Sequence, residues 1–203
     1  PDEIYNLAAQ SSVGKSFHEP SETFKSIVQG TINILEACRK TNYLGRIFFA
    51  GSSEIFGNTD KAANIKHPQN PASPYGIAKK TSLELVELYR EIYNIKCCTG
   101  VLFNHESILR GDSFVVKKMI QNAIESQNNK EHKFLLGNIN IIRDWGSAVE
   151  YVEAMQLINR QNIPQDEVIC TGKKASLKNL LEEIFEFFEL DWQKHVIIDQ
   201  KLF

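Results

Sequence analysis

The sequence predicts an α/β fold, a doubly wound parallel sheet followed by a smaller C-terminal part, from three observations. Apolar stretches of strand length alternate with stretches whose apolar residues recur at three- and four-residue steps, as in helices. Several strand-like stretches are continuously apolar, which is typical of parallel strands buried on both faces. The chain has 203 residues and 42% of them are hydrophobic, enough for a sizeable core. Such alternation implies right-handed crossovers and helices on both faces of the sheet.

The first half of the chain contains five expected elements. Phe24, Ile27 and Leu35 keep helical spacing, and Gly45 then separates that helix from an apolar strand. Pro74 favours a helix start, because the first N–H groups of a helix have no intrahelical partner. In order, we expect a strand at Ile4–Ala8, a helix at Glu22–Thr41, a strand at Arg46–Ala50, a helix at Pro74–Tyr93 and a strand at Ile95–Leu102.

The second half continues the alternation, but its composition becomes more mixed after about Asn104. We therefore expect a first domain at 1–104 and a second part at 105–203, with the chain crossing between the two. The expected elements are a helix at Ser113–Gln127, a strand at Phe134–Leu136, a helix at Ala148–Arg160, a strand at Val168–Thr171, a helix at Leu177–Leu190 and a strand at Val196–Ile198.

Bulk composition argues against several classes of protein. The net charge is -2, so a nucleic-acid partner, which needs a basic face, is not expected. The four cysteines form no C-x-x-C pair and the histidines are scattered, so we expect no metal site, no disulfide framework and a reduced, cytoplasmic protein. No apolar run reaches about 18 residues and no signal peptide opens the chain, so no membrane association is expected.

The first candidate for chemistry is the pair Tyr75 and Lys79. Residues four apart lie on one helix face, where a fixed ammonium favours the phenolate of a nearby tyrosine. A phenol has a pKa of about 10, so this help is what would let Tyr75 exchange a proton with a sugar hydroxyl. The spacing is common, however. Taken alone, it favours the structural interpretation, in which Tyr75 caps the helix and Lys79 is solvated.

Polar residues at three successive strand ends favour the chemical interpretation. Ligands of doubly wound sheets bind at the carboxyl ends of the strands. The strand at Arg46–Ala50 leads into Ser52 and Glu54, and the first strand leads into small and then polar residues. The third leads into Asn104 and His105, although a lone histidine there also fits an ordinary loop residue. We expect one crevice to receive all three groups.

Five short segments, spread over nearly the whole chain, resemble one enzyme family. They are N-L-A-A-Q-S at 6–11, S-S-E at 52–54, Y-G-x-x-K at 75–79, L-F-N-H-E-S at 102–107 and R-D-W-G at 143–146. The set resembles the GDP-mannose 4,6-dehydratases, which belong to the extended short-chain dehydrogenase/reductases and have a Rossmann-like sheet. L-F-N-H-E-S and R-D-W-G are specific to these enzymes and their nearest relatives, whereas Y-x-x-x-K marks only the superfamily.

The resemblance implies an internal redox cycle on a nucleotide sugar. Hydride passes from C4 of the hexose to NADP while Tyr75, polarised by Lys79, accepts the O4 proton and Ser52 hydrogen-bonds O4. Glu54 then removes the proton at C5, water leaves from C6, and hydride returns to C6. The product is a 4-keto-6-deoxy sugar.

The resemblance also implies ligand contacts. NADP is the implied cofactor, with NAD left open, and a GDP-sugar is the implied substrate. Arg143 suits a diphosphate because its donor fork is planar, but a local ion pair with Asp144 is the alternative. Trp145 is expected to pack in the core. The implied cofactor contacts are Leu7, Ala8, Ala9, Gln10, Ser11, Lys79, His105 and Arg110, and the implied substrate contacts are Ser53, Asn104 and Arg143.

Departures from the family pattern leave the sugar open. Glu22 stands where the family often has a tyrosine near the cofactor, Ser12 replaces a common histidine, and Ile108-Leu109 replaces a Pro-Arg-like pair. GDP-mannose or a close GDP-sugar such as a GDP-heptose would fit. The helices at Glu22–Thr41 and Pro74–Tyr93 pack between subunits in the superfamily, which implies a homodimer or homotetramer.

The family's glycine-rich loop, G-x-x-G-x-x-G, has no match among the 11 glycines. That loop and the helix after it hold the pyrophosphate of the dinucleotide. We therefore expect the N-terminal part of the sheet to be missing and the 203-residue chain alone to have little activity. Two alternatives remain: a non-catalytic remnant that binds nucleotide-sugar or pairs with a full-length subunit, and a nucleotide-sugar epimerase, which Glu54 disfavours because epimerisation at C4 needs no C5 base.

Overall fold

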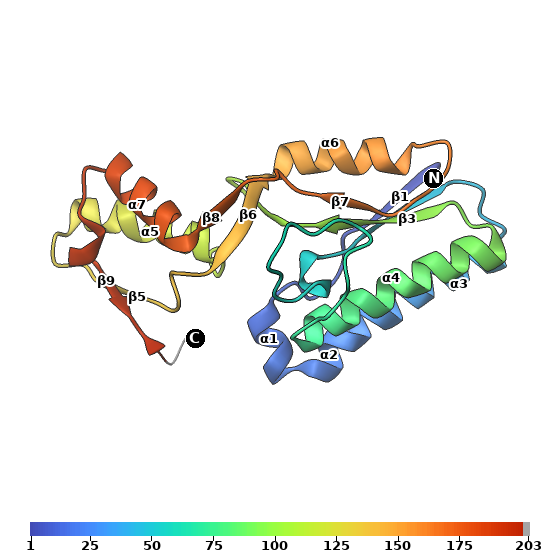
Figure 1. The fold of residues 1–203 in the computed structure, drawn as a ribbon, viewed down its shortest axis with the longest axis horizontal. Helices are drawn as coiled ribbons and strands as arrows, with labels where there is room; N and C mark the ends of the chain where they lie inside the picture. Colours follow the sequence, from blue (N-terminus) through green and yellow to red (C-terminus); the bar gives the residue numbers. More distant parts are fainter. Residues whose placement is uncertain (201–203) are drawn as a thin grey trace. The chain divides into compact units, whose positions relative to one another are not determined.

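The computed structural model describes residues 1–200, which form two compact units (Figure 1). The first unit contains Pro1–Phe103 and Val149–Cys170, and the second contains Asn104–Ala148 and the chain from Thr171 onward. The chain thus leaves the first unit after Phe103, returns for residues 149–170 and leaves again.

The first unit is built on a four-stranded parallel sheet in the order β1-β2-β3-β7. The strands are β1 (Glu3–Asn6), β2 (Arg46–Ala50), β3 (Cys97–Leu102) and β7 (Glu167–Ile169). Every residue of β3 is buried, as expected for a central strand covered on both faces. The predicted α/β class and parallel sheet are confirmed.

Helices cover both faces of this sheet (Figure 1). Side chains alternate along β2, so Ile47 and Phe49 pack against α3 (Gly30–Lys40) and α4 (Pro74–Tyr93), whereas Phe48 packs against α6 (Ala148–Asn159). α4 is the longest helix in this unit and carries charged residues along its length. Among residues 1–200, no helix combines the length and the apolar character needed to cross a membrane.

The helix predicted at Glu22–Thr41 is confirmed as one continuous helical run, made of α2 (Pro20–Phe24), a π-helical turn at Lys25–Gln29 and α3. The π-turn and the preceding α1 (Val13–His18) were not predicted. Ser12 caps α1 by accepting a hydrogen bond from the Lys15 N–H at 3.2 Å. Both the six-residue α1 and the π-turn are too short to impose a period on the sequence.

The second unit has a core of its own. α5 (Val115–Asn128) and α7 (Leu177–Phe187) pack Met119, Leu181 and Phe185 together, and Trp145 packs against them, as predicted. The capping box of Ser176 and Asn179 starts α7. β5 (Phe134–Leu136) and β9 (Val196–Ile198) form a parallel pair, and the 3-10 turn Trp192–Lys194 precedes β9.

A small mixed sheet in the second unit corrects the expectation that all strands are parallel. It contains β4 (Asn104–Glu106), β6 (Ile142–Ser147) and β8 (Lys174–Ser176), with β4 parallel and β8 antiparallel to β6. The sequence analysis predicted none of these strands. They are short, polar and only partly buried, so they carry neither an apolar run nor a clean alternation.

Candidate functional site

A tight turn follows β2 in the first unit. A Cβ on Gly51 would lie 2.7 Å from Thr99 Cγ2 and 2.9 Å from the Gly100 carbonyl oxygen, so only glycine lets β2 and β3 run this close here. The chain then enters a 3-10 turn at Ser53–Ile55, which Ser52 caps by accepting a hydrogen bond from the Glu54 N–H at 3.3 Å. Ser52 is buried and Glu54 is half-buried.

The first turn of α4 packs directly on this strand-end turn. Ser73 caps the helix by accepting from the Gly76 N–H at 3.0 Å, and Pro74 occupies the first helical position. A Cβ on Gly76 would lie 2.7 Å from the carbonyl oxygen of Glu54. Close backbone approach at Gly76 therefore brings the helix that carries Tyr75 onto the turn that carries Glu54. From the sequence, Gly76 was identified only as part of the Y-G-x-x-K motif. A glycine directly after Tyr75 was nevertheless a signal of close backbone packing at this position.

Tyr75 and Lys79 are both buried in the structure, each 8% exposed. Lys79 Nζ donates a hydrogen bond to the Ala50 carbonyl oxygen at 2.7 Å and lies 5.7 Å from the centre of the Tyr75 ring. Burial lowers the pKa of the Lys79 ammonium to about 8. The alternative, in which Tyr75 only caps the helix and Lys79 is solvated, does not describe this site, because Ser73 caps the helix and Lys79 is buried.

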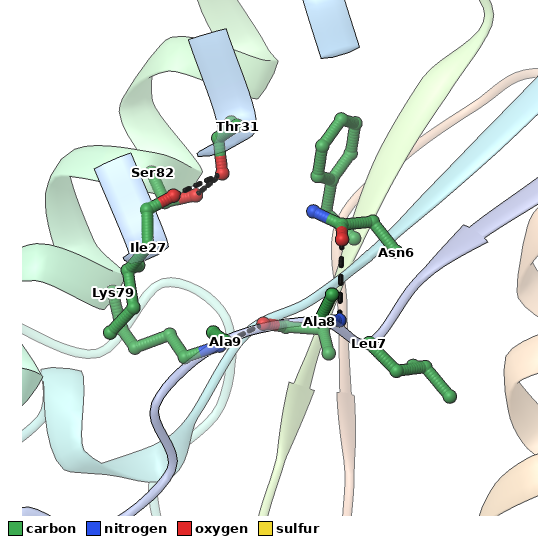
Figure 2. Close-up of a pocket in the computed structure, with 10 residues that line it drawn as sticks. Asn6, Leu7, Ala8, Ala9, Ile27, Thr31, Lys79 and Ser82 are labelled. Carbon is green, nitrogen blue, oxygen red and sulfur yellow. Dashed lines mark hydrogen bonds between the residues drawn. The ribbon is translucent and has the colours of Figure 1, made fainter. Parts of the chain in front are cut away.

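A small hollow lies beside Lys79 (Figure 2). Asn6, Leu7, Ala8 and Ala9 line it from the end of β1, and Ala50 lines it from the end of β2. Leu7, Ala8 and Ser11 are exposed, whereas Ala9 and Gln10 are half-buried. Ala8 and Ala9 contribute only methyl groups to this side of the hollow. The ends of two strands and α4 thus meet where the sequence predicted a ligand.

The floor of the hollow is formed by Ile27, Thr31, Phe49 and Ser82. Thr31 and Ser82 join α3 to α4 through a buried hydroxyl pair 2.5 Å apart, and the Thr31 hydroxyl also contacts the Ile27 carbonyl oxygen at 2.8 Å (Figure 2). The sequence analysis did not identify this pair, because a lone threonine and a lone serine on two helices carry no motif.

The remaining candidates belong to the second unit. Asn104 and His105 lie on β4, opposite Trp145 and Gly146 of β6. Arg143 lies on β6 and donates from Nη1 to the carbonyl oxygen of Ile142 at 2.9 Å. Joining these residues with Lys79 and Tyr75 in a single crevice stays a prediction.

Arg110 is held by two neighbours in the second unit. Its Cζ lies 3.6 Å from the centre of the Phe114 ring, and its Nε lies 3.3 Å from a carboxylate oxygen of Glu106. Burial raises the pKa of Glu106, against the opposing effect of Arg110. Beside this group Ile108 and Leu109 are 89% and 88% exposed.

The fold is shared with several solved structures. RMD from Pseudomonas aeruginosa, solved with NADPH, matches with a TM-score of 0.88 at 21% identity, over 98% of this chain and 70% of that one. DesIV, a dTDP-glucose 4,6-dehydratase from Streptomyces venezuelae solved with NAD and DAU, matches with a TM-score of 0.88 at 19% identity, over 100% and 62%. A UDP-glucose 4-epimerase from Thermotoga maritima gives 0.85 at 22%, over 99% and 65%. At these identities the matches show the fold alone.

Relatives found by sequence identify the family more specifically than the shared fold does. GDP-mannose 4,6 dehydratase 1 of Arabidopsis thaliana is 40% identical over 207 residues, covering 100% of this chain and 57% of the relative. GDP-mannose 4,6-dehydratase of Sinorhizobium fredii is 41% identical over 189 residues, covering 92% and 54%. The chain therefore spans about half the length of these relatives. The family model described as GDP-mannose 4,6 dehydratase matches residues 1–201, and the chain belongs to the GDP-mannose 4,6-dehydratase family.

Proposed function

We propose that a full-length protein containing this chain converts GDP-mannose, or a close GDP-sugar such as a GDP-heptose, into its 4-keto-6-deoxy derivative. One observation carries the proposal. The turn with Ser52 and Glu54 packs against the helix turn with Tyr75, with Gly76 in close contact with the Glu54 backbone. A hydroxyl, a carboxylate and a phenol backed by a buried cation therefore belong to one rigid corner of the first unit.

In the first half of the reaction, the phenolate of Tyr75 takes the proton from O4 of the hexose as hydride leaves C4. Lys79 lies 5.7 Å from the Tyr75 ring centre and favours the phenolate. The hydrogen bond from Lys79 to Ala50 anchors this cation at the end of β2. Ser52 donates a hydrogen bond to O4 and orients it.

In the second half, Glu54 removes the proton at C5, which the 4-keto group makes acidic, and passes it to the C6 hydroxyl, which leaves as water. C5 takes up a proton again when hydride returns to C6. This base distinguishes the proposed reaction from epimerisation at C4, which needs no proton removed from C5. Glu54 follows Ser52 by two residues, so both act from the same turn.

The hollow beside Lys79 suits a nicotinamide cofactor. Ala8 and Ala9 present only methyl groups to the hollow, and Lys79 supplies a cation at its wall. A bound NADP would supply the acceptor for the C4 hydride and the donor that restores hydride at C6, and NAD is the alternative. We expect its other contacts at Leu7, Ser11, His105 and Arg110, and at the backbone of Gln10.

The second unit supplies the expected substrate contacts. Asn104 and Arg143 are candidates for the nucleotide and diphosphate, together with Ser53 of the first unit. Arg143 is suited to a diphosphate because its guanidinium can donate two parallel hydrogen bonds.

A homodimer, or a homotetramer built from it, is the expected assembly. On α4, Ile77 and Leu88 are each 45% exposed and Ile92 is 59% exposed. Together with the neighbouring α3, this helix offers apolar surface to a second copy. Light scattering of the purified protein checks the assembly, and a monomer at micromolar concentration would contradict it.

Product analysis of a Glu54→Gln variant tests the function. Amide replaces carboxylate with little change in shape, so the fold is expected to persist while product formation falls by at least about 100-fold. Glu84→Gln, an exposed substitution on α4, is the matched control and should retain wild-type turnover. Absence of dehydration by the intact protein, or unchanged turnover in Glu54→Gln, would refute the proposal.

A further inference from the structure

The side-chain amide of Gln10 is fully engaged inside the protein. Its Nε2 donates to the Ser12 carbonyl oxygen at 2.9 Å and to Thr23 Oγ1 at 3.0 Å, while its Oε1 accepts from the Ser12 N–H. A glutamine amide has two donor hydrogens, and both are used here. The lone pair left on Oε1 is an acceptor, which a phosphate or a ribose oxygen would repel.

The partners of Gln10 lie on the helical segment that crosses behind the loop. Thr23, at the end of α2, is fully buried, and its hydroxyl donates to the Glu19 carbonyl oxygen at 2.9 Å. Its lone pairs are therefore left for Gln10. Ser26, in the π-helical turn, accepts from the Gln10 backbone N–H at 3.3 Å and donates to the Thr23 carbonyl oxygen at 3.2 Å. The loop after β1 is thus fixed to this segment by side-chain and backbone hydrogen bonds.

The same segment reaches the hollow beside Lys79. Ile27, one residue after Ser26, lines the hollow and packs against Tyr75 and Ala78 of α4. Ala9, one residue before Gln10, packs against the same cluster. Fixing Gln10 to Thr23 and Ser26 therefore sets where Leu7, Ala8 and Ala9 stand relative to the catalytic helix.

We propose that Gln10, Thr23 and Ser26 form a latch that positions the loop Leu7–Ala9 for a nicotinamide dinucleotide, and that the Gln10 side chain does not itself contact the ligand. This inference rests on the proposed function. Gln10, Thr23 and Ser26 act as positioning residues, because they hold the loop and do not touch the ligand. The ligand is met by the backbone and short side chains of the loop. A loosened loop would have to be ordered again when the ligand binds, which lowers affinity.

The test is NADPH titration of the full-length protein in four variants. Gln10→Glu keeps the shape but turns two donors into acceptors that face the Ser12 carbonyl and Thr23 Oγ1, so we expect NADPH to bind about tenfold more weakly. Thr23→Val keeps the volume and removes the hydroxyl, with a similar expected loss. Thr23→Ser removes a buried methyl but keeps the hydroxyl and should bind as the wild type does. Gln29→Glu makes the same charge change on an exposed residue of the π-turn and is the matched control.

The two threonine variants separate positioning from packing. If Thr23 only fills space, Thr23→Ser would weaken binding at least as much as Thr23→Val, and the latch would be refuted. Wild-type affinity in Gln10→Glu would refute it as well. Hydrogen exchange over residues 8–12 without ligand gives a second readout, in which Gln10→Glu and Thr23→Val should exchange faster and Thr23→Ser should not. A wild-type protein that binds no NADPH contradicts the proposed function, and the exchange rates then decide the latch.

Discussion

Lys79 in the first unit and Arg110 in the second are the two cations proposed to face the cofactor, and their surroundings differ in kind. Lys79 is 8% exposed, and its ammonium donates a hydrogen bond to a neutral carbonyl oxygen. Arg110 is half-buried beside a carboxylate and lies over an aromatic ring. Burial lowers the pKa of the Lys79 ammonium to about 8, whereas the charge of Arg110 is offset by the neighbouring carboxylate of Glu106. One cation suits proton chemistry and the other suits steady attraction of an anion.

The largest expected effect tests whether Lys79 is a destabilising charge. Lys79→Met should raise the free energy of unfolding at pH 7 by up to about 3.5 kcal/mol while abolishing activity, because burial lowers the pKa of Lys79 from 10.5 to about 8 and each pKa unit corresponds to about 1.4 kcal/mol. Between pH 8 and 10.5 the unfolded chain binds the proton that the folded chain has lost, so wild-type stability rises with pH in that window. The advantage of Lys79→Met should therefore fade there. Urea unfolding at pH 7 and pH 10 measures it.

Lys80→Met serves as the control for this comparison. Lys80 is the next residue on α4, and its ammonium lies 3.8 Å from Glu84 at the surface. We expect a change within about 0.5 kcal/mol. A Lys79→Met protein less stable than the wild type at pH 7 would show that the hydrogen bond to Ala50 outweighs the burial of charge.

A second prediction concerns the close packing of α4 against the turn that carries Glu54 in the first unit. Gly76→Ala places a methyl 2.7 Å from the Glu54 carbonyl oxygen and 3.0 Å from Pro71 Cβ, so we expect a loss of about 2 kcal/mol in the free energy of unfolding despite the better helix propensity of alanine. Gly30→Ala is the matched control, since no atom lies within 4 Å of its added Cβ, and it should gain up to about 1 kcal/mol. Thermal unfolding of both variants measures the difference. Equal effects would mean that α4 can shift away from the turn.

This contrast between the two units also decides what the sequence could predict. The strand at Arg46–Ala50 and the helix at Pro74–Tyr93 were predicted with their observed bounds, because a long apolar period and a Pro start are local signals. The placing of Tyr75 against Glu54 depends on backbone approach at Gly76, which a single sequence records only as a glycine. The latch around Gln10 depends on a π-helical turn that no periodicity marks.

The second unit was less predictable for a physical reason. β4 and β8 have three residues each and are only partly buried, so their pairing with β6 depends on tertiary contacts rather than on local propensity. Two residues predicted from the family motifs lie in this small sheet: His105 on β4 and Arg143 on β6. Their identity was readable, but their surroundings were not.

The smallest expected effect tests the compensation at Arg110. Burial raises the pKa of Glu106, so between its usual value of 4.5 and the raised value the folded chain binds the extra proton, and stability falls as pH rises through that window. Glu106→Gln removes the buried charge while Arg110 keeps its stacking on Phe114 and some access to water. We therefore expect a gain of less than about 1 kcal/mol at pH 7 that disappears below pH 4.5, measured by urea unfolding at both ends. Glu125→Gln, an exposed substitution on α5, should show neither effect. If Glu106→Gln instead loses stability at pH 7, the ion pair with Arg110 is net stabilising, and the difference between the two cations is larger than burial alone implies.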